Sequence, residues 1–262
     1  MNTDVLFESG KTAAKALKFI NEDILSGAVR YIISPFRPEG LEKEKHILLL
    51  PYVLRSENEE ALSDLIKRER PERVLIRNME ELGFLKDMDF SGEIDSDASL
   101  YSFNRESIMV LKSLGVKHFT CPYELDLYEL RERGCDSSSM VIYGRTPLMV
   151  SAQCTYKTGS GKCRSERDGF LSGITDRKKV SFPVWHECRY CYNLIYNSVP
   201  LSLFKEEEDL LSLSPDSLRL DFTTESPEEA SKIIKAYVCG DRARLSELVP
   251  AYTKGHFRKG TE

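Results

Sequence analysis

The sequence lacks the segments that would direct it into or across a membrane. The first ten residues, MNTDVLFESG, contain no basic start followed by an apolar run, and no later apolar stretch approaches the length that spans a bilayer. These absences argue against a secreted or membrane-inserted protein. We therefore expect a cytoplasmic protein with no membrane insertion.

An excess of positive charge is also missing, because the formal net charge is −5. No overall basic field is therefore expected to attract nucleic acid. One local exception is the segment 157–179, in which lysine and arginine outnumber acidic residues. This segment is either a solvated loop, which we favour, or a local contact for RNA.

Several common catalytic signatures are absent. The sequence contains no Ser–His–Asp pattern, no metalloprotease helix motif, no Walker loop and no dinucleotide-binding glycine fingerprint. At 262 residues, with 41% hydrophobic and 30% charged residues, the chain has the composition of a globular protein with a real core. One domain is expected.

Strand-like and helix-like segments alternate along much of the chain. The predicted strands are 46–53, 73–78, 92–100, 117–124, 139–145 and 217–223. The first five begin 27, 19, 25 and 22 residues apart, which is typical of βα units joined by short loops. The pattern predicts an α/β fold with parallel strands, and a βα-barrel of the TIM type is favoured over an open sheet.

Three sequence signals predict where helices of this barrel begin. Ser56 with Glu59, and Ser226 with Glu229, are spaced as capping boxes, and Asn104 precedes an apolar periodic segment. Ahead of the first predicted strand, residues 11–25 place apolar side chains at helical spacing. We therefore interpret residues 1–45 as a lead-in helical segment.

The regular alternation stops after Arg145 and resumes at the last predicted strand. Residues 46–262 form the predicted barrel domain, and residues 146–216 form an inserted cysteine-rich module within it. Because a closed barrel needs eight strands and only six are recognised, we expect an incomplete barrel. A second protein chain, or a second copy of this one, is expected to cover its open side.

Four of the seven cysteines lie in the predicted module, at Cys154, Cys163, Cys188 and Cys191. The gaps between them are eight, twenty-four and two residues. The two-residue gap lets both thiolates reach one metal, and in a reducing compartment clustered cysteines indicate metal or redox chemistry rather than disulfides. We predict a metal centre on these four residues, with four unrelated buried thiols as the alternative.

Four thiolates suit a zinc ion or an iron–sulfur cluster. A structural zinc site usually shows two short cysteine pairs, whereas this sequence shows one, so an iron–sulfur cluster is favoured. His186 is a rival ligand or a loop histidine, and we favour the loop. The remaining cysteines, Cys121, Cys135 and Cys239, are interpreted as core or surface thiols.

Charged residues near the ends of predicted strands are the other candidates for chemistry. Acidic examples are Asp95, Asp97, Glu124 and Asp221. On the open face of a barrel, each could act as a general acid or base, and each could equally cap a helix or pair with an arginine such as Arg219. As the catalytic set we select Asp95, Glu124, Arg145 and Asp221.

The stretches VIYGRTPLMVSAQC, TDRKKVSFPV, CRYCYNLIYNSVPLSL and RLDFT, followed by YTKGHFRKG, occur in this order. In their order and their residues they resemble the collagenase-like peptidase family, whose members are peptidases of unknown catalytic type. The likeness covers residues 46–262 and is closest to the carboxyl-terminal portion of the long members.

The resemblance implies a βα-type barrel in which Cys154, Cys163, Cys188 and Cys191 hold a four-iron, four-sulfur cluster. Several branches of the family carry out oxygen-independent hydroxylation, on RNA pyrimidines or on a quinone precursor. The resemblance therefore implies an iron–sulfur hydroxylase acting on RNA or a small aromatic substrate. The alternatives are a peptidase, as the family label says, and a non-catalytic zinc-binding split subunit.

Overall fold

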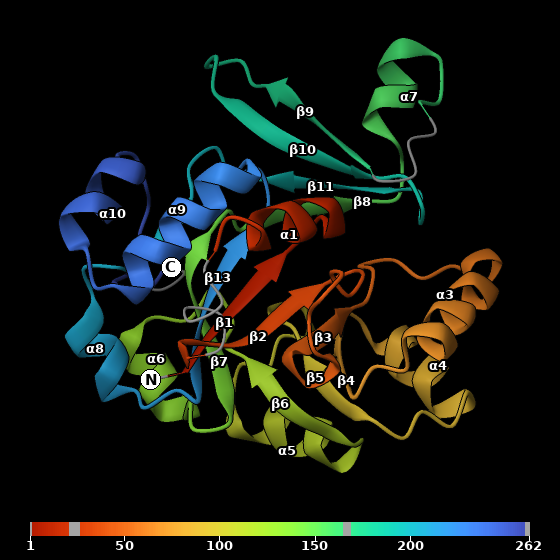
Figure 1. The fold of residues 1–262 in the computed structure, drawn as a ribbon, viewed down its shortest axis with the longest axis horizontal. Helices are drawn as coiled ribbons and strands as arrows, with labels where there is room; N and C mark the ends of the chain where they lie inside the picture. The colour runs from red at the N-terminus through yellow and green to blue at the C-terminus, as the bar shows by residue number, and fades with distance from the viewer. Residues whose placement is uncertain (1, 21–26, 165–168, 260–262) are drawn as a thin grey trace.

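The computed structural model describes residues 2–20, 27–164 and 169–259. Parallel strands form a barrel surrounded by helices, and a smaller sheet stands over one end of it (Figure 1). The barrel strands are β1 (Asn2–Phe7), β2 (Val29–Ser34), β3 (His46–Leu49), β4 (Arg73–Ile76), β5 (Glu93–Ser96), β6 (Val116–Thr120), β7 (Ser138–Gly144) and β13 (Ser217–Phe222).

The eight strands close into a complete ring. They follow one another in chain order from β1 to β7, and β13 lies between β7 and β1. The pairing of β6 with β7, through Phe119 opposite Ser138, closes the ring, and every pair around it is parallel. The predicted TIM-type α/β fold is confirmed, and all six predicted strands belong to the barrel.

The prediction of an incomplete barrel is wrong, because β1 and β2 lie within the segment interpreted as a helical lead-in. A shorter helix, α1 (Gly10–Leu17), joins them, and residues 21–25 of the predicted helix fall outside the described residues. A buried carboxylate, Asp4, interrupts the apolar run of β1 and accepts hydrogen bonds from Arg30 of β2. Closure also removes the open strand edges that motivated a partner chain or a second copy.

Helices pack around the outside of the ring: α3 (Ser56–Glu69), α4 (Met79–Asp87), α5 (Arg105–Ser113), α6 (Leu127–Arg133), α8 (Glu207–Ser212), α9 (Pro227–Val238) and α10 (Arg242–Leu248). Short 3₁₀ turns occur at Lys43–Lys45 and Ala98–Leu100. Leu62, Leu82 and Leu111 lie on the inner faces of three of these helices and are buried in the core. Burial of one such side chain contributes roughly 1.5–3 kcal/mol. Among the described helices, a search for an apolar segment of bilayer-spanning length finds none.

Two of the predicted helix starts are confirmed and one is wrong. The side chains of Asn104 and Ser226 accept hydrogen bonds from backbone amides three residues later, and both helices have capping boxes. Ser56 is instead the first helical residue, and Arg55 occupies the cap position without a side-chain capping bond. The Arg55 guanidinium is used elsewhere, as described below.

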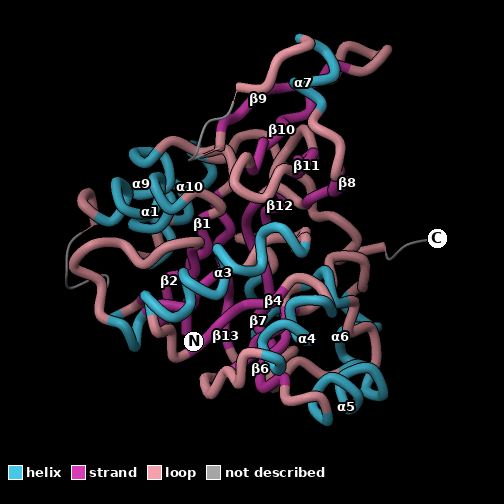
Figure 2. Tube along the Cα trace, turned by 90° about the vertical axis from the view of Figure 1, so that its right-hand side faces the viewer, coloured by secondary structure: helices cyan, strands magenta, loops and turns pink. Residues whose placement is uncertain are grey.

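An insertion follows the carboxyl end of β7, as predicted. It contains β8 (Pro147–Ser151), α7 (Thr155–Ser160), β9 (Phe170–Thr175), β10 (Ser181–Glu187) and β11 (Tyr192–Tyr196). The four strands form an antiparallel sheet in the order β8-β11-β10-β9, which we call the module sheet. The chain then returns through β12 (Leu201–Ser202), which pairs with the end of β7. The module sheet stands over the barrel in both views (Figures 1 and 2).

Candidate functional site at the carboxyl end of the barrel

The sheet topology brings the four predicted cysteine ligands to one end of the module. Cys154 follows the end of β8, Cys163 precedes the start of β9, and Cys188 and Cys191 lie in the turn from β10 to β11. Because neighbouring strands are antiparallel, these four chain positions meet at the same end of the sheet. Helix α7 lies at this end as well (Figure 1).

The cysteines differ in their surroundings. Cys154 and Cys188 are half-buried, whereas Cys163 and Cys191 are exposed. Cys191 has a left-handed backbone (φ 57°), which turns the chain sharply between β10 and β11. Among the described residues, no group of three or more histidine, cysteine or acidic side chains is close enough to hold a metal ion. The donor chemistry therefore fits a thiolate-bound centre, while the side-chain positions do not form one.

His186 lies beside Cys154. Its Nδ1 lies 3.9 Å from Cys154 Sγ, and its Nε2 lies 2.7 Å from Ser172 Oγ. The ring is 1% exposed and stacks on Phe170 at 4.2 Å between centroids. The interpretation of His186 as a loop histidine is wrong, because it lies inside β10 and faces a buried pocket of aromatic side chains.

Arg55 connects the cysteine end of the module to the barrel. Its guanidinium donates to the backbone carbonyls of Tyr190 (2.6 Å), Cys191 (3.1 Å) and Ala152 (3.2 Å). Those carbonyls belong to two different loops of the module, and both loops carry predicted cysteine ligands. A single barrel residue therefore holds the two loops together.

Beneath the module lies a buried layer of charged side chains at the carboxyl ends of the barrel strands. We call it the carboxyl-end layer; it consists of Glu8, Arg77, Asp97, Arg219 and Asp221, and each is at most 6% exposed. Active sites of TIM-type barrels form at this end.

The carboxyl-end layer is a continuous network of charge-assisted hydrogen bonds. Arg77 donates to both Glu8 oxygens at 2.7 and 2.8 Å and to Asp97 at 3.3 Å. Arg219 donates to Asp97 at 2.8 Å and to both Asp221 oxygens at 2.8 and 2.9 Å. Each arginine therefore bridges two carboxylates, which is the arrangement that a buried charge requires.

The pKa values of the two carboxylates bound to Arg219 are shifted in opposite directions. Burial raises the pKa of Asp97, but Arg219 and Arg77 together outweigh that effect and hold its pKa below the ordinary value. Burial raises the pKa of Asp221 to about 6, because its bonded partner Arg219 and the more distant Arg77 offset the effect of burial only in part. Asp221 is therefore the member of the layer best placed to exchange a proton near neutral pH.

Aromatic side chains of the module sheet cover this layer. Trp185, Tyr190, Tyr192, Leu194 and Tyr196 form a buried cluster that packs against Tyr52 and Val53 of the barrel. The Tyr52 amide donates to Tyr192 Oη at 3.2 Å, and the Tyr52 ring lies 4.1 Å from the Arg77 guanidinium. The cavity left between Glu8, Arg77 and Tyr192 is about 10 Å³, enough for one water at most.

Some buried polar atoms at this end have no hydrogen-bond partner among the described residues. They are Tyr196 Oη, Trp185 Nε1, Glu124 Oε2, Thr223 Oγ1 and Glu81 Oε1. Burial raises the pKa of Tyr196 and of Glu81 well above the ordinary values. Unpartnered groups of this kind are rare in native proteins, and two of these, Tyr196 Oη and Trp185 Nε1, belong to the module sheet.

The predicted catalytic residues occupy different places. Asp221 belongs to the carboxyl-end layer, paired with Arg219 as the alternative interpretation stated, and Glu124 lies in the loop after β6. Asp95 is not on the open face: it pairs with Arg73 at 2.9 Å at the other end of the strands. It lies within β5, whereas Asp97 directly follows that strand, so Asp95 belongs to the layer below.

Arg145 stands at the junction between the barrel and the module. It donates to the carbonyls of Asn197 (2.9 Å) and Ser198 and to Thr224 Oγ1 at 3.1 Å. These contacts fix the chain where it leaves and re-enters the barrel. Arg145 therefore organises the junction and does not point at the carboxyl-end layer.

The sequence did not identify Glu8, Arg77 or the module tyrosines that cover the carboxyl-end layer. Glu8 follows a strand that was not recognised, and Arg77 was interpreted as part of a predicted strand. A usable signal was the polar residue directly after each apolar barrel strand, which occurs at Glu8, Arg77 and Asp97. The tyrosines carried no comparable signal, because their role depends on where the module folds back.

The basic residues of segment 157–179 that the structure describes lie at both ends of the module sheet. Lys157 and Lys162 lie at the cysteine end, whereas Arg177, Lys178 and Lys179 lie at the turn between β9 and β10, at the other end of the sheet. All five are exposed. This distribution fits the favoured interpretation of a solvated segment better than a compact RNA contact.

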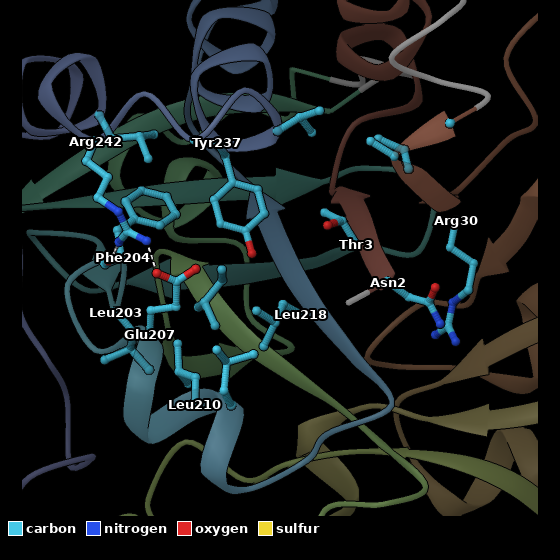
Figure 3. Close-up of a pocket in the computed structure, with 18 of the residues that line it drawn as sticks. Asn2, Thr3, Arg30, Leu203, Phe204, Glu207, Leu210, Leu218, Tyr237 and Arg242 are labelled. Atoms are coloured by element: carbon cyan, nitrogen blue, oxygen red, sulfur yellow. Dashed lines mark hydrogen bonds and ion pairs between the residues drawn. The ribbon is translucent and has the colours of Figure 1, made fainter.

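A cavity of about 710 Å³ lies outside the barrel, near the amino-terminal ends of β1 and β2 (Figure 3). Its deep apolar residues, such as Leu210 and Leu218, are already buried. Its charged groups are paired, Arg30 with Asp4 and Arg242 with Glu207. It therefore offers little surface or free charge to a ligand, and it is remote from the cysteine end.

Comparison with known proteins gives no family. No protein-family model matches the sequence, and no curated protein matches it. Among solved structures, the C-terminal domain of a protein assigned as a chitinase from Desulfitobacterium hafniense DCB-2 is 9% identical, with a TM-score of 0.43, over 93% of this chain and 99% of that chain. The spore cortex-lytic enzyme SleL of Bacillus megaterium QM B1551 is 10% identical, with a TM-score of 0.41, over 89% of this chain and 73% of that chain.

The SleL enzyme of Bacillus cereus is 7% identical, with a TM-score of 0.38, over 97% of this chain and 75% of that chain. Likenesses at these scores carry no argument about function. The barrel assignment rests on the strand pairing itself.

Proposed function

We propose that this chain is a cysteine-bound metal enzyme of the collagenase-like peptidase type, performing oxygen-independent hydroxylation on RNA or a small aromatic substrate. The observation that carries the proposal is the meeting of Cys154, Cys163, Cys188 and Cys191 at one end of the module sheet. That end is attached to the face of the barrel where TIM-type enzymes carry their sites. The sequence resemblance supplies the reaction class.

Thiolate donors favour soft or borderline metals, so the proposed centre is an iron–sulfur cluster, and a zinc ion is the alternative. When bound, a cluster supplies one-electron chemistry at the rim of the barrel. The protein supplies the placement: Arg55 fixes two cysteine-bearing loops, and His186 lies against Cys154. A neighbouring imidazole of this kind can donate to a ligand sulfur and orient it.

The carboxyl-end layer is the proposed substrate side of the site. Asp221, with its pKa raised to about 6 by burial, can give or take a proton, and Arg219 holds its carboxylate in place. The aromatic cover of the module excludes water from this layer. An enzyme that moves electrons and protons at a substrate benefits from both properties.

The test is metal content after oxygen-free purification. Iron and acid-labile sulfide should exceed zinc, and the protein should absorb visible light. Serine replacements at each of the four cysteines should lower the metal content severalfold. Cys239→Ser, which changes an exposed cysteine outside the module, is the matched control and should retain full metal content.

Other outcomes are informative. A colourless protein with one zinc per chain would favour the non-catalytic zinc-binding alternative. Absence of metal from protein purified without oxygen, with all four thiols freely alkylated, would reject the metal centre. Hydroxylation itself is tested by the mass of RNA nucleosides from cells with and without the gene, where loss of a nucleoside heavier by one oxygen is expected.

One observation favours a peptidase as the second candidate. Cys154 Sγ lies 3.9 Å from His186 Nδ1, and Ser172 holds the other side of the ring, an arrangement suited to a thiol nucleophile with its base. A peptidase would lose gelatin hydrolysis on Cys154→Ser or His186→Gln and keep it on Cys163→Ser. A metal enzyme would respond to all four cysteine replacements alike.

A further inference from the structure

The module sheet is attached to the barrel in a way that resembles a hinged cover. Its two connections to the barrel lie side by side: β8 begins directly after β7, and β11 ends opposite the start of β8, where Tyr196 pairs with Pro147. Asn197 N donates to Thr146 O at 3.0 Å, and Arg145 joins the same two segments. All covalent attachment is therefore at one end of the sheet.

The opposite end of the sheet is held by Arg55. Ser151 pairs with Asn193 at that end, and the Arg55 guanidinium donates to three backbone carbonyls just beyond this pair. Arg55 comes from the loop between β3 and α3, so this contact crosses from the barrel to the module. A hinge at one end and a multidentate contact at the other are the two parts of a closing element.

The interface between these two ends is closed but incompletely satisfied. Tyr196 Oη and Trp185 Nε1 are buried there without a hydrogen-bond partner among the described residues. Each such group is shielded from water in the closed position and has no bond among the described residues to replace its hydration. Burying these unpartnered groups therefore makes the closed position of the module less favourable.

We infer that the module is a movable lid over the carboxyl-end layer, that the structure shows it closed, and that Arg55 is its latch. The gap between the lid and the Glu8–Arg77 pair leaves room for one water at most, and Asp221 is only 6% exposed, so a substrate reaches the layer only after the lid opens. Opening pivots on the Arg145 junction and separates Tyr192 and Tyr196 from the barrel. The inference does not depend on metal occupancy.

Two probes report opening in the protein as it exists. The Tyr52 amide of the barrel donates to Tyr192 Oη of the module, so its hydrogen exchanges when the lid opens. The Leu50 amide, two residues earlier, donates to Leu75 O within the barrel and serves as the internal control. Trp185 is the only tryptophan, so acrylamide quenching of its fluorescence reports exposure of the interface.

In the unmodified protein, the Tyr52 amide should exchange at least tenfold faster than the Leu50 amide. Arg55→Gln should raise the Tyr52 exchange rate and the quenching of Trp185 by a further tenfold or more, with the Leu50 rate unchanged. Arg55→Lys should give an intermediate result, because an ammonium cannot reach three carbonyls in the same planar geometry. The matched control is Arg105→Gln, which removes an arginine-to-carbonyl bond between helices α5 and α6 of the barrel and should change neither probe.

The inference is overturned if Tyr52 and Leu50 exchange at the same rate in the unmodified protein, since the module would then open only with global unfolding. It is also overturned if Arg55→Gln leaves both probes unchanged, or accelerates Leu50 as much as Tyr52. The first measurement needs no variant, so a variant that fails to fold does not remove the test. Protein stripped of metal by a chelator should behave in the same way, which separates this result from the metal proposal.

Discussion

The barrel carries two layers of arginine–carboxylate pairs, one at each end, and they differ in their access to water. The carboxyl-end layer is sealed: Arg219 is 1% exposed and Asp97 3%. The amino-end layer, made of Asp4, Arg30, Arg73, Asp95 and Asp216, is partly open, with the Arg30 and Asp216 side chains 22% and 27% exposed. The chemistry of the pairs is alike, but the carboxyl end is covered, by Tyr52 and Tyr123 of the barrel loops and by the aromatic cluster of the module.

This difference shows at which end of the barrel the charged side chains are held in a fixed arrangement away from water. A buried ion pair gains less than its attraction suggests, because both charges lose their hydration. A sealed layer with several carboxylates is therefore weak evidence for stability and stronger evidence for a site. In the amino-end layer this cost falls on Asp4 and Asp95, which are 1% and 6% exposed, whereas Arg30 and Arg73 keep part of their contact with water.

The largest expected effect is on the sealed layer. Arg219→Met should lower the free energy of unfolding by about 3–5 kcal/mol, because Asp97 and Asp221 would remain buried without their shared cation. Urea titration followed by circular dichroism measures it. Arg73→Met, in the open layer, is the matched control and should cost less than half as much. Equal losses would show that the cover of the carboxyl end does not set the difference.

The strands of the barrel were largely predictable, and the reason lies in their composition. Residues 46–49 and 73–76 are short apolar runs bounded by turns and charged residues, which is enough to recognise a buried strand. In β1 and β2, Asp4 and Arg30 interrupt the apolar pattern because they pair with each other inside the fold. A pair of this kind is visible only once both strands are placed.

The candidate site was predictable in part. Cysteine spacing indicated one site, and the sheet topology does bring the four residues to one end, although their thiols form no metal-binding group among the described residues. The positions of Arg55 and His186 depend on tertiary contacts across long sequence separations, so no local pattern could reveal them. Asp95 and Asp97 show the limit clearly, since a residue within β5 and the residue just after its end belong to different layers.

A sealed titratable group also occurs at the start of β3. His46 is 3% exposed, and burial lowers its pKa from 6.5 to about 4. Between these pH values the unfolded chain binds more protons than the folded one, so stability falls as pH decreases from about 6.5 toward 4 and is unaffected above that range. The loss should reach about 3 kcal/mol.

His46→Gln should flatten this part of the stability profile, measured as the difference between the two proteins at each pH. His118→Gln, which changes a histidine that is 28% exposed beside Asp216, is the control and should leave the profile nearly unchanged. An identical acid-side slope for the unmodified protein and His46→Gln would contradict the assignment.

A smaller effect of opposite sign is expected at the lid interface. Tyr196→Phe removes a buried hydroxyl that has no partner among the described residues, so the variant should be more stable by about 1 kcal/mol. Thermal unfolding measures the gain. Tyr143→Phe, which removes a hydroxyl bonded to Glu225 at 2.8 Å, is the contrasting variant and should be destabilised. A loss of stability in Tyr196→Phe would mean that its hydroxyl is bonded to a buried water.

The smallest effect concerns the rim of the open layer. Asp216 accepts a hydrogen bond from Arg30 at 2.5 Å, and the two side chains are 27% and 22% exposed. Solvent screens a pair of this kind, and Arg30 keeps its second carboxylate, Asp4. Asp216→Asn should therefore lower the free energy of unfolding by about 0.5 kcal/mol or less, and the difference should shrink further in 0.5 M salt, a concentration at which the Debye length is only about 4 Å. Urea titration at low and high salt measures both quantities. A salt-independent loss approaching that of Arg219→Met would mean that the amino-terminal end is sealed as tightly as the carboxyl end, and the contrast between the two layers would then have no basis in solvent access.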